Sequence, residues 1–204
     1  MHQNSYLIFL AYAKKYISAG MKVLEIGPDR SPSTYQSLSQ TDTAAWDTLD
    51  LYQSPHLTYV ASGPYSFPIP DGTYDVVISG QVLEHVPKVW TWMKEVARVA
   101  KPGGVIITIA PASWPYHEAP IDCWRVYPEG MKALSEEAGL AVEFCAWGTM
   151  EHPEIKNALP GRSAEDQPPG FRAICLQLAQ SHEFPVEKSF DTICIARKPL
   201  APAG

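Results

Sequence analysis

Short apolar runs alternate along this chain with segments in which apolar residues recur at helical spacing. The short runs are almost continuously apolar, which is typical of strands buried on both faces of a parallel sheet. We expect strands at residues 23–26, 44–51, 56–61, 74–79, 105–110, 140–146 and 190–196. We expect helices at residues 5–18, from Ser31 or Ser33 to about residue 39, at 89–100 and at 127–139. The alternation predicts an α/β fold with a doubly wound, mostly parallel, seven-stranded sheet and helices on both faces.

The turn after the first expected strand is the strongest local signal. The apolar run at residues 23–26 breaks at once into Gly27 and Pro28. Glycine allows a backbone conformation that other residues resist, and it lets a ligand approach the main chain closely. A strand, a glycine turn and a helix form the first unit of nucleotide-binding α/β domains, in which ligands lie beyond the carboxyl ends of the strands.

A carboxylate at the end of the second expected strand fits the same kind of site. Asp50 lies 23 residues after Gly27. In such folds an acid about 20 residues after the glycine turn receives the ribose hydroxyls. Asp47 is the competing candidate, and its simpler interpretation is an exposed strand residue.

The length and the breaks in the pattern predict one domain. A chain of 204 residues is long enough for one well-buried core and too short for two comfortable ones. We expect an N-terminal helix at 1–20, a cofactor-binding core at 21–147, an insertion or lid at 148–187 and a closing strand at 188–197. A short helix is expected at 171–179 within the insertion.

Composition narrows the classes of function. A net charge of -6 argues against binding nucleic acid through phosphate neutralisation. No apolar run approaches the roughly 20 residues that span a bilayer, and no cationic region precedes the first apolar segment as in a secretory signal. The four cysteines lack metal-type spacing. We therefore expect a cytoplasmic protein with reduced thiols and no metal site, and the oligomeric state stays open.

Four blocks of the sequence resemble the motifs of class I S-adenosylmethionine-dependent methyltransferases, in the same order and spacing. They are Val-Leu-Glu-Ile-Gly at 23–27, the loop and strand at 67–79, Gln-Val-Leu-Glu-His at 81–85 and Ala-Arg-Val-Ala-Lys-Pro-Gly-Gly at 97–104. The resemblance covers about residues 20–148. It implies a Rossmann-like fold and S-adenosylmethionine as the cofactor.

The resemblance also implies a set of cofactor-binding residues. The backbone at Gly27 would approach the methionine part, Glu25 would lie near the ammonium, and Asp50 would take the ribose hydroxyls. The whole expected set is Glu25, Gly27, Pro28, Asp50, Leu51, Ser62, Ser79, Gly80, Gln81 and His85. The chain departs from the family at Pro28, where further glycines are usual, and at Gly63, where an acid often meets the adenine. Adenine would then be held by main chain, by Ser62 or Ser66, or by packing against Tyr65.

The segment after the fifth expected strand, residues 110–127, is the candidate acceptor site. It mixes aromatic and hydrogen-bonding side chains, which suit a sugar or another flat, partly polar substrate. We expect His117 to act as the general base, and substrate contacts from Trp114, Tyr116, Asp122, Trp124 and Arg125. Its Tyr-His-x-x-Pro-x-Asp-x-Trp-Arg pattern resembles methyltransferases that accompany saccharide biosynthesis. The alternatives are an Asp122–Arg125 pair that only holds the loop, a core-anchoring Trp124 and a structural His117.

These observations lead to one expected function and two alternatives. The expected reaction is methyl transfer to a small-molecule partner, with O-methylation of a saccharide-like or other partly polar acceptor. N-methylation is the nearest alternative. The other is a relative without activity that binds the cofactor or only a partner protein. Because the sulfonium already makes the methyl group electrophilic, the protein mainly has to align it with a nucleophile and exclude water.

Overall fold

Seven strands form one sheet in the computed structural model, which describes residues 3–41, 44–118, 120–150 and 189–200. The strands are β1 (Lys22–Ile26), β2 (Ala45–Asp50), β3 (Tyr59–Val60), β4 (Tyr74–Gly80), β5 (Ala100–Ser113), β6 (Ala141–Gly148) and β7 (Phe190–Arg197). Their order is β3-β2-β1-β4-β5-β7-β6. Only β7 runs antiparallel to its neighbours, so the expected mostly parallel sheet is confirmed.

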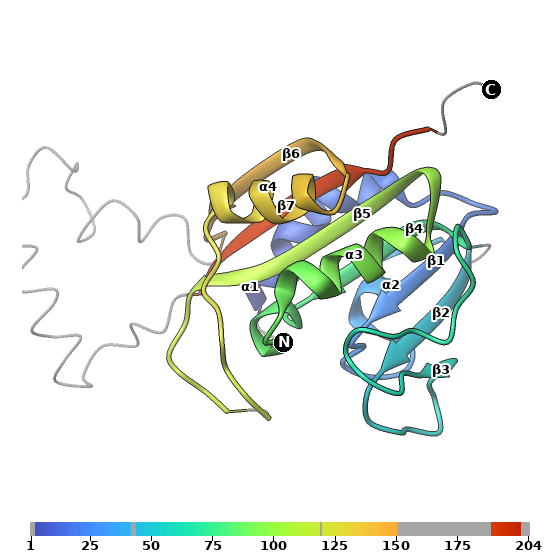
Figure 1. The fold of residues 1–204 in the computed structure, drawn as a ribbon, viewed down its shortest axis with the longest axis horizontal. Helices are drawn as coiled ribbons and strands as arrows, with labels where there is room; N and C mark the ends of the chain where they lie inside the picture. The colour runs from blue at the N-terminus through green and yellow to red at the C-terminus, as the bar shows by residue number, and fades with distance from the viewer. Residues whose placement is uncertain (1–2, 42–43, 119, 151–188, 201–204) are drawn as a thin grey trace, which may run out of the picture.

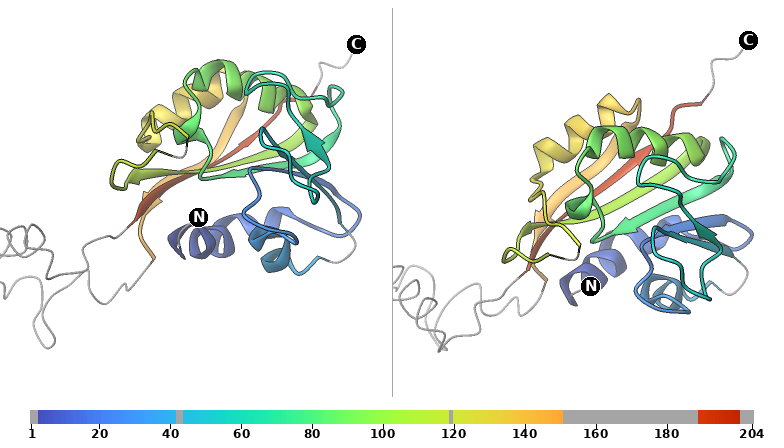
Figure 2. Two further views of the ribbon diagram at one scale, coloured as in Figure 1. Left: turned by 90° about the horizontal axis from the view of Figure 1, so that it is seen from below. Right: turned by 60° about the horizontal axis from the view of Figure 1, so that its bottom comes forward.

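Helices cover both faces of this sheet (Figures 1 and 2). The helix α1 (Gln3–Ile8), extended by π and 3-10 turns to Tyr16, lies on one face with α2 (Thr34–Ser39). The helices α3 (Val89–Val99) and α4 (Pro128–Glu137) lie on the other face. Ser33 caps α2 as its sequence position predicts, because its side-chain oxygen accepts a hydrogen bond from the Gln36 N–H at 3.0 Å.

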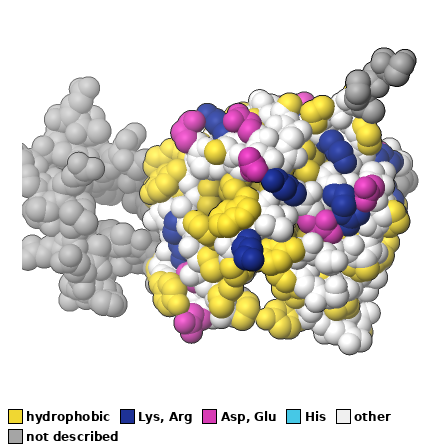
Figure 3. Space-filling view, in the orientation of Figure 1, with side chains coloured by type: hydrophobic (Ala, Val, Ile, Leu, Met, Phe, Trp, Pro, Cys, Tyr) yellow, Lys and Arg dark blue, Asp and Glu magenta, His cyan; other side chains and the backbone are white. Residues whose placement is uncertain are grey.

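The two faces of the sheet bury separate apolar layers. Because successive side chains of a strand point to opposite faces, Leu24 and Ile26 of β1 pack under α3 while Val23 packs under α1. On α3, apolar residues recur at Val89, Trp92, Met93 and Val96, and all four are buried. The outer surface over α3 and α4 also carries hydrophobic side chains (Figure 3).

Three of the expected element boundaries are wrong. The third strand is Tyr59–Val60 and not 56–61, because the Thr48 and Thr58 side chains replace the ladder there: each hydroxyl accepts the other residue's N–H at 3.1 Å. The fifth strand extends to Ala100–Ser113 because it continues its pairing along β4 and β7. The first helix begins at Gln3 and its last 3-10 turn ends at Tyr16.

Most of the expected insertion at 148–187, with its helix at 171–179, lies outside the described residues. Within the described ranges, no helix is long and apolar enough to cross a membrane.

The strand order places a ligand crevice between β1 and β4. The chain winds from β1 outwards to β3 and then crosses back to β4 on the other side of β1. In open α/β sheets, the loops after two such strands diverge to opposite faces and leave a crevice at the carboxyl edge. The loops that follow β2 and β5 project from this same edge (Figure 1).

Candidate active site

A cleft of about 440 Å³ lies at the carboxyl ends of β1, β2 and β4. Its volume falls in the range of small-molecule sites, and most of its wall is apolar. The lining residues are Ile26, Gly27, Leu49, Asp50, Leu51, Tyr52, Ala61, Pro64, Tyr65, Phe67, Gln81, Val82, His85, Val86, Pro87, Trp92, Pro120 and Ile121. The cleft therefore brings together five of the ten expected cofactor-binding residues: Gly27, Asp50, Leu51, Gln81 and His85.

The turn at Gly27 forms one wall of the cleft. Its φ is +71°, a left-handed value that favours glycine. Its N–H donates a hydrogen bond to the Leu49 carbonyl at 2.9 Å, which ties the turn to β2. A Cβ atom at this position would lie 2.3 Å from Cγ2 of Val82. The turn after β1 thus packs directly against the turn after β4.

Asp50 ends β2 and lies in the cleft wall. Its Oδ1 accepts a hydrogen bond from the Leu51 N–H at 2.6 Å, and the side chain is half-buried. It also borders a smaller hollow of about 140 Å³, where Pro28 lies. Asp47 does not line the cleft, because its carboxylate accepts the Tyr74 hydroxyl at 2.8 Å and pairs with Lys22 at 3.4 Å. The geometry favours Asp50 over Asp47.

Besides Pro28, four expected cofactor residues do not line the cleft. The pleat turns Glu25 to the opposite face from Ile26, where Ser33 and Trp46 donate hydrogen bonds to it. Gly80 makes room for Tyr35, whose hydroxyl would lie 2.1 Å from a Cβ atom there. The other two are Ser79, which is fully buried, and Ser62, which is exposed outside the cleft.

The end of the cleft near Gly63 is apolar. Gly63 pairs with Ser66 in a single β-bridge, and neither residue lines the cleft. Tyr65 and Phe67 do line it, and the Tyr65 hydroxyl accepts the Lys88 N–H at 3.1 Å. Neither Ser62 nor Ser66 lines this wall, so the alternatives for adenine that it can provide are main chain and packing against Tyr65.

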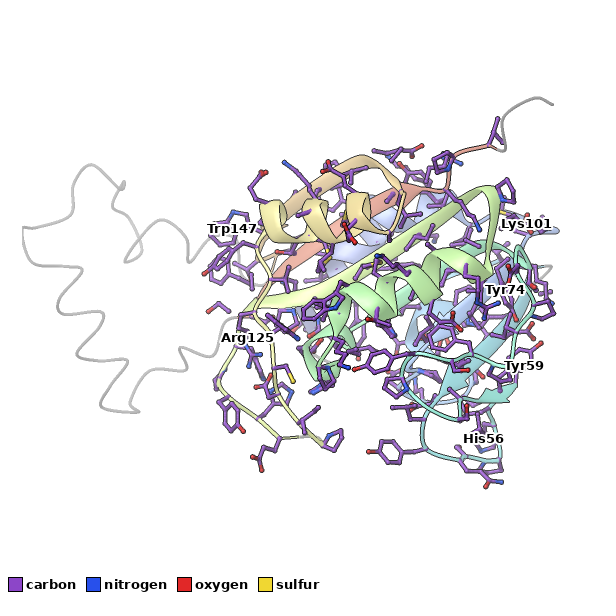
Figure 4. The ribbon with its side chains drawn as sticks, viewed as in Figure 1. His56, Tyr59, Tyr74, Lys101, Arg125 and Trp147 are labelled. Atoms are coloured by element: carbon purple, nitrogen blue, oxygen red, sulfur yellow. The ribbon has the colours of Figure 1, made fainter. Side chains whose placement is uncertain are left out.

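An internal salt bridge holds the 114–126 loop. Asp122 and Arg125 share two hydrogen bonds of 2.6 Å, and the Asp122 side chain is 1% exposed. The other three N–H groups of Arg125 donate to the carbonyls of Trp114, Pro115 and Trp124. The guanidinium has five N–H groups, so the loop uses all of them. Arg125 lies where the loop returns to the sheet, as Figure 4 shows.

The expected acceptor residues line a hollow of their own. Its volume is about 270 Å³, and its lining residues are Trp114, Tyr116, Asp122, Cys123, Trp124 and Arg125. Trp124 also anchors the loop, because its Nε1–H donates to the Val86 carbonyl at 2.9 Å. Tyr116 is 71% exposed. The loop is therefore anchored through Trp124 and exposes an aromatic side chain at Tyr116.

The imidazole of His117 in this loop contacts that of His85 in the cleft wall. His85 lines the cleft, and its Nδ1 is hydrogen-bonded to the Ile121 carbonyl. The His117 ring packs edge-on against it, with centroids 5.1 Å apart. His117 Nδ1 lies 3.4 Å from Oδ2 of Asp122, whose pKa the Arg125 hydrogen bonds hold far below its ordinary value. The Pro115 carbonyl also lies 3.4 Å from this Nδ1, so both oxygen atoms near Nδ1 are hydrogen-bond acceptors.

Two buried carboxyl groups lie beside the site. Burial raises the pKa of Glu25 to about 7, against the hydrogen bonds from Ser33 and Trp46. Burial also raises the pKa of Glu84 to about 8, and the nearby Asp191 adds to the shift. Each carboxyl keeps one buried oxygen without a hydrogen bond. Burial therefore favours the protonated form of both carboxyl groups.

The apolar residues of the cleft wall were not found from the sequence. Val82, Val86, Trp92 and Ile121 have the same composition as any core segment, so no chemical signature marks them. Their neighbours in sequence gave the only usable signal, since Val82 and Val86 flank the 81–85 motif.

The cleft fits S-adenosylmethionine in size and in polarity. An apolar end suits adenine, Asp50 offers acceptors for ribose hydroxyls, and the Gly27 turn brings main chain to the wall. Gln81 adds an amide at the end of β4.

Comparison with known proteins shows which part of this chain resembles a methyltransferase. Residues 19–108 match a family model described as a methyltransferase domain. An uncharacterised methyltransferase of Mycobacteroides abscessus is 29% identical over 96 residues, which cover 47% of this chain and 34% of the relative. The chain spans about a third or less of the length of the curated relatives that it matches.

Solved structures agree on the fold. An S-adenosylmethionine-dependent methyltransferase from Archaeoglobus fulgidus has a TM-score of 0.62 and 18% identity, with 95% of each chain covered. A chain in a complex with the Haloferax volcanii Trm112 methyltransferase activator has a TM-score of 0.66 and 16% identity, with 100% of this chain and 92% of that chain covered. These structures confirm the expected Rossmann-like fold, and the link to saccharide biosynthesis is not shown.

The contact between the two turns can be tested at Gly27. We expect Gly27→Ala to lower the free energy of unfolding more than Gly20→Ala does. Both positions have a left-handed φ, but only at Gly27 would the new Cβ meet another side chain. The left-handed backbone alone costs about 1–2 kcal/mol, and the clash adds to this at Gly27. In the Gly27→Ala background, Val82→Ala should recover part of the loss in urea denaturation. Equal losses at the two glycines would contradict the packing described.

The buried Glu84 should make stability depend on pH. A carboxyl whose folded pKa lies above its ordinary 4.5 stabilises the fold most at low pH, and this contribution is lost as pH rises through about 8. Glu84→Gln removes the ionisation, so we expect its free energy of unfolding to exceed that of the wild type by a growing margin from about pH 5 to about pH 9. The exposed Glu136→Gln is the control and should show no such trend in the same denaturation series. A constant margin would exclude a titrating Glu84.

Proposed function

We propose that this class I methyltransferase domain transfers a methyl group from S-adenosylmethionine to a hydroxyl oxygen of a small, partly polar molecule. One observation carries the proposal: a cleft of about 440 Å³ lies at the β1–β4 crossing, with Gly27 and Asp50 in its wall. This is the position at which open α/β sheets bind nucleotide ligands. A saccharide-like acceptor is part of the proposal because aromatic and polar groups alternate in the 114–126 loop.

Different residues of the cleft bind different parts of the cofactor. Asp50 accepts the ribose hydroxyls, and Leu51, Tyr65 and Phe67 pack around the adenosine. Gln81 and the main chain at Gly27 meet the amino-acid end. The bound cofactor supplies a methyl group that is already electrophilic, so these residues contribute alignment and exclusion of water.

His117 is our candidate for the general base. A hydroxyl must lose its proton as its oxygen becomes methylated, and an imidazole can accept that proton near neutral pH. The Asp122 carboxylate beside Nδ1 orients the ring and stabilises the imidazolium that forms. His85 is the rival candidate, because it lies in the cleft wall itself. We propose substrate contacts from Trp114, Tyr116 and Trp124, while Asp122 and Arg125 brace the loop that carries them.

Two alternatives compete with this proposal. N-methylation needs less help from a base, because an amine can attack before its proton leaves. A relative without activity would bind the cofactor alone, or only a partner protein. Calorimetry with S-adenosylmethionine and S-adenosylhomocysteine separates them: binding of neither compound favours a partner-only role, and binding without turnover across an acceptor screen favours a cofactor-binding module.

The cofactor assignment predicts a different effect at two acids of the same strand. Asp50→Ala should weaken S-adenosylhomocysteine binding by about 1–3 kcal/mol, the scale of lost hydrogen bonds to a charged group. Asp47→Ala is the matched control, because its carboxylate contacts Tyr74 and Lys22 instead of the cleft. The Asp47→Ala variant should bind S-adenosylhomocysteine with wild-type affinity in titration calorimetry. Unchanged affinity in Asp50→Ala would remove the ribose assignment.

Substitution of His117 should affect turnover, whereas substitution of His85 should affect cofactor binding. His117→Ala should lower kcat by about a hundredfold or more, the usual contribution of a general base, with cofactor affinity nearly intact. His85→Ala should weaken cofactor binding, because the ring lies in the cleft wall. Methyl transfer to an acceptor found in a screen of saccharides and phenols measures the first effect, and calorimetry measures the second. If His85→Ala abolishes turnover while His117→Ala retains it, the base is His85.

A further inference from the structure

Gln81 lines the cleft, and its amide nitrogen is hydrogen-bonded to the protein interior. Its Nε2 donates hydrogen bonds to Ser5 Oγ at 2.7 Å and to Asp191 Oδ1 at 3.0 Å. An amide nitrogen has two hydrogens, so both are used. Because Asp191 Oδ1 accepts one of these hydrogen bonds, the amide nitrogen points inward. Oε1 is the remaining polar atom, and no described group donates to it.

The orientation of Asp191 is fixed in turn by main chain. Its Oδ2 accepts a hydrogen bond from Asn4 Nδ2 at 2.6 Å. Asn4 Nδ2 also donates to the Gly148 carbonyl at 3.0 Å, and Asn4 Oδ1 accepts the Met150 N–H at 2.7 Å. Because backbone groups cannot exchange donor and acceptor, Asn4 cannot flip. Asn4 and Asp191 are both fully buried, so water does not compete for these bonds.

The backbone at Gln81 is also unusual. Its φ is +60°, which is left-handed and costs a non-glycine residue about 1–2 kcal/mol. The Gln81 N–H donates to the Ile109 carbonyl at 2.8 Å, so β5 holds the strained turn. Strain of this kind at a cleft is evidence that the side chain has a required position.

We infer that Asn4 and Asp191 are positioning residues that set the polarity of the Gln81 amide, so that its Oε1 accepts a hydrogen bond from the ammonium of the bound methyl donor. An amide turned the other way would present an NH2 group to the ammonium and repel it. The donor-binding end of the cleft thus depends on α1 and β7 as well as on the loops after β1 and β4. This inference rests on the proposed cofactor site.

The substitution Asp191→Asn should reverse the amide. Asn4 presents a fixed donor, so the new side chain must turn its oxygen to Asn4 and its NH2 to Gln81. Gln81 then turns its own oxygen inward and its NH2 to the cleft. We expect affinity for S-adenosylhomocysteine to fall by about tenfold to a hundredfold. Affinity for 5′-methylthioadenosine, which has no amino-acid part, should stay unchanged.

A purely structural role would weaken both ligands together, so the ratio of the two affinities is the decisive readout. Gln81→Asn is the second variant: asparagine tolerates the left-handed backbone, but its shorter amide cannot keep both inward bonds and reach the ammonium. It should give the same selective loss, and thermal unfolding reports whether either variant folds. If binding of both ligands weakens equally, or if both affinities are unchanged, this inference is overturned but the proposed function is not. If the wild type binds neither compound, the proposed function falls and this inference with it.

Discussion

The cleft depends on the close approach of Gly27 to Val82. With no side chain at position 27, the turn after β1 packs on the turn after β4, and any Cβ would lie 2.3 Å from Val82. This contact joins the ends of β1 and β4, the neighbouring strands at which the winding of the chain reverses. It also places Asp50, which ends the neighbouring strand β2, and Gln81, which precedes Val82, at two walls of one cavity. The binding groups come from separate segments, and this packing fixes the distance between them.

The sequence predicted the parts of this arrangement that short-range order determines. Gly27 and Asp50 each follow an apolar strand, and parallel strands bring their carboxyl ends to one edge. The same logic could not find Val82 or Ile121, because an apolar residue gives no sign of whether it faces a ligand or the core. It also could not find the Gln81–Asp191 contact, which joins residues 110 positions apart through the pairing of β5 with β7.

Glu25 shows a different limit. Its place in the motif suggested a contact with the cofactor, but a strand alternates its side chains, and the cleft opens on the face of Ile26. The carboxyl is held among Ser33 and Trp46, where burial raises its pKa to about 7. A carboxyl buried between the first strand and α2 supports the turn from the face opposite the cleft. Motif position alone does not separate these two roles.

The two halves of the proposed reaction are encoded in different parts of the chain. The shared region, residues 19–108, which matches a methyltransferase-domain family, contains the Gly27 turn, Asp50 and Gln81. The 114–126 loop, α1 and β7 all lie outside it. If Asp191 and Asn4 orient Gln81 as we infer, residues outside the shared region act on both sides of the methyl group: one set holds the donor's charged end, and the other faces the acceptor. Because all five N–H groups of Arg125 donate hydrogen bonds within the loop, the loop keeps its shape without a ligand. A pre-shaped acceptor surface beside a fixed donor limits the motion needed to align the reacting atoms, and alignment is the main task this chemistry leaves to the protein.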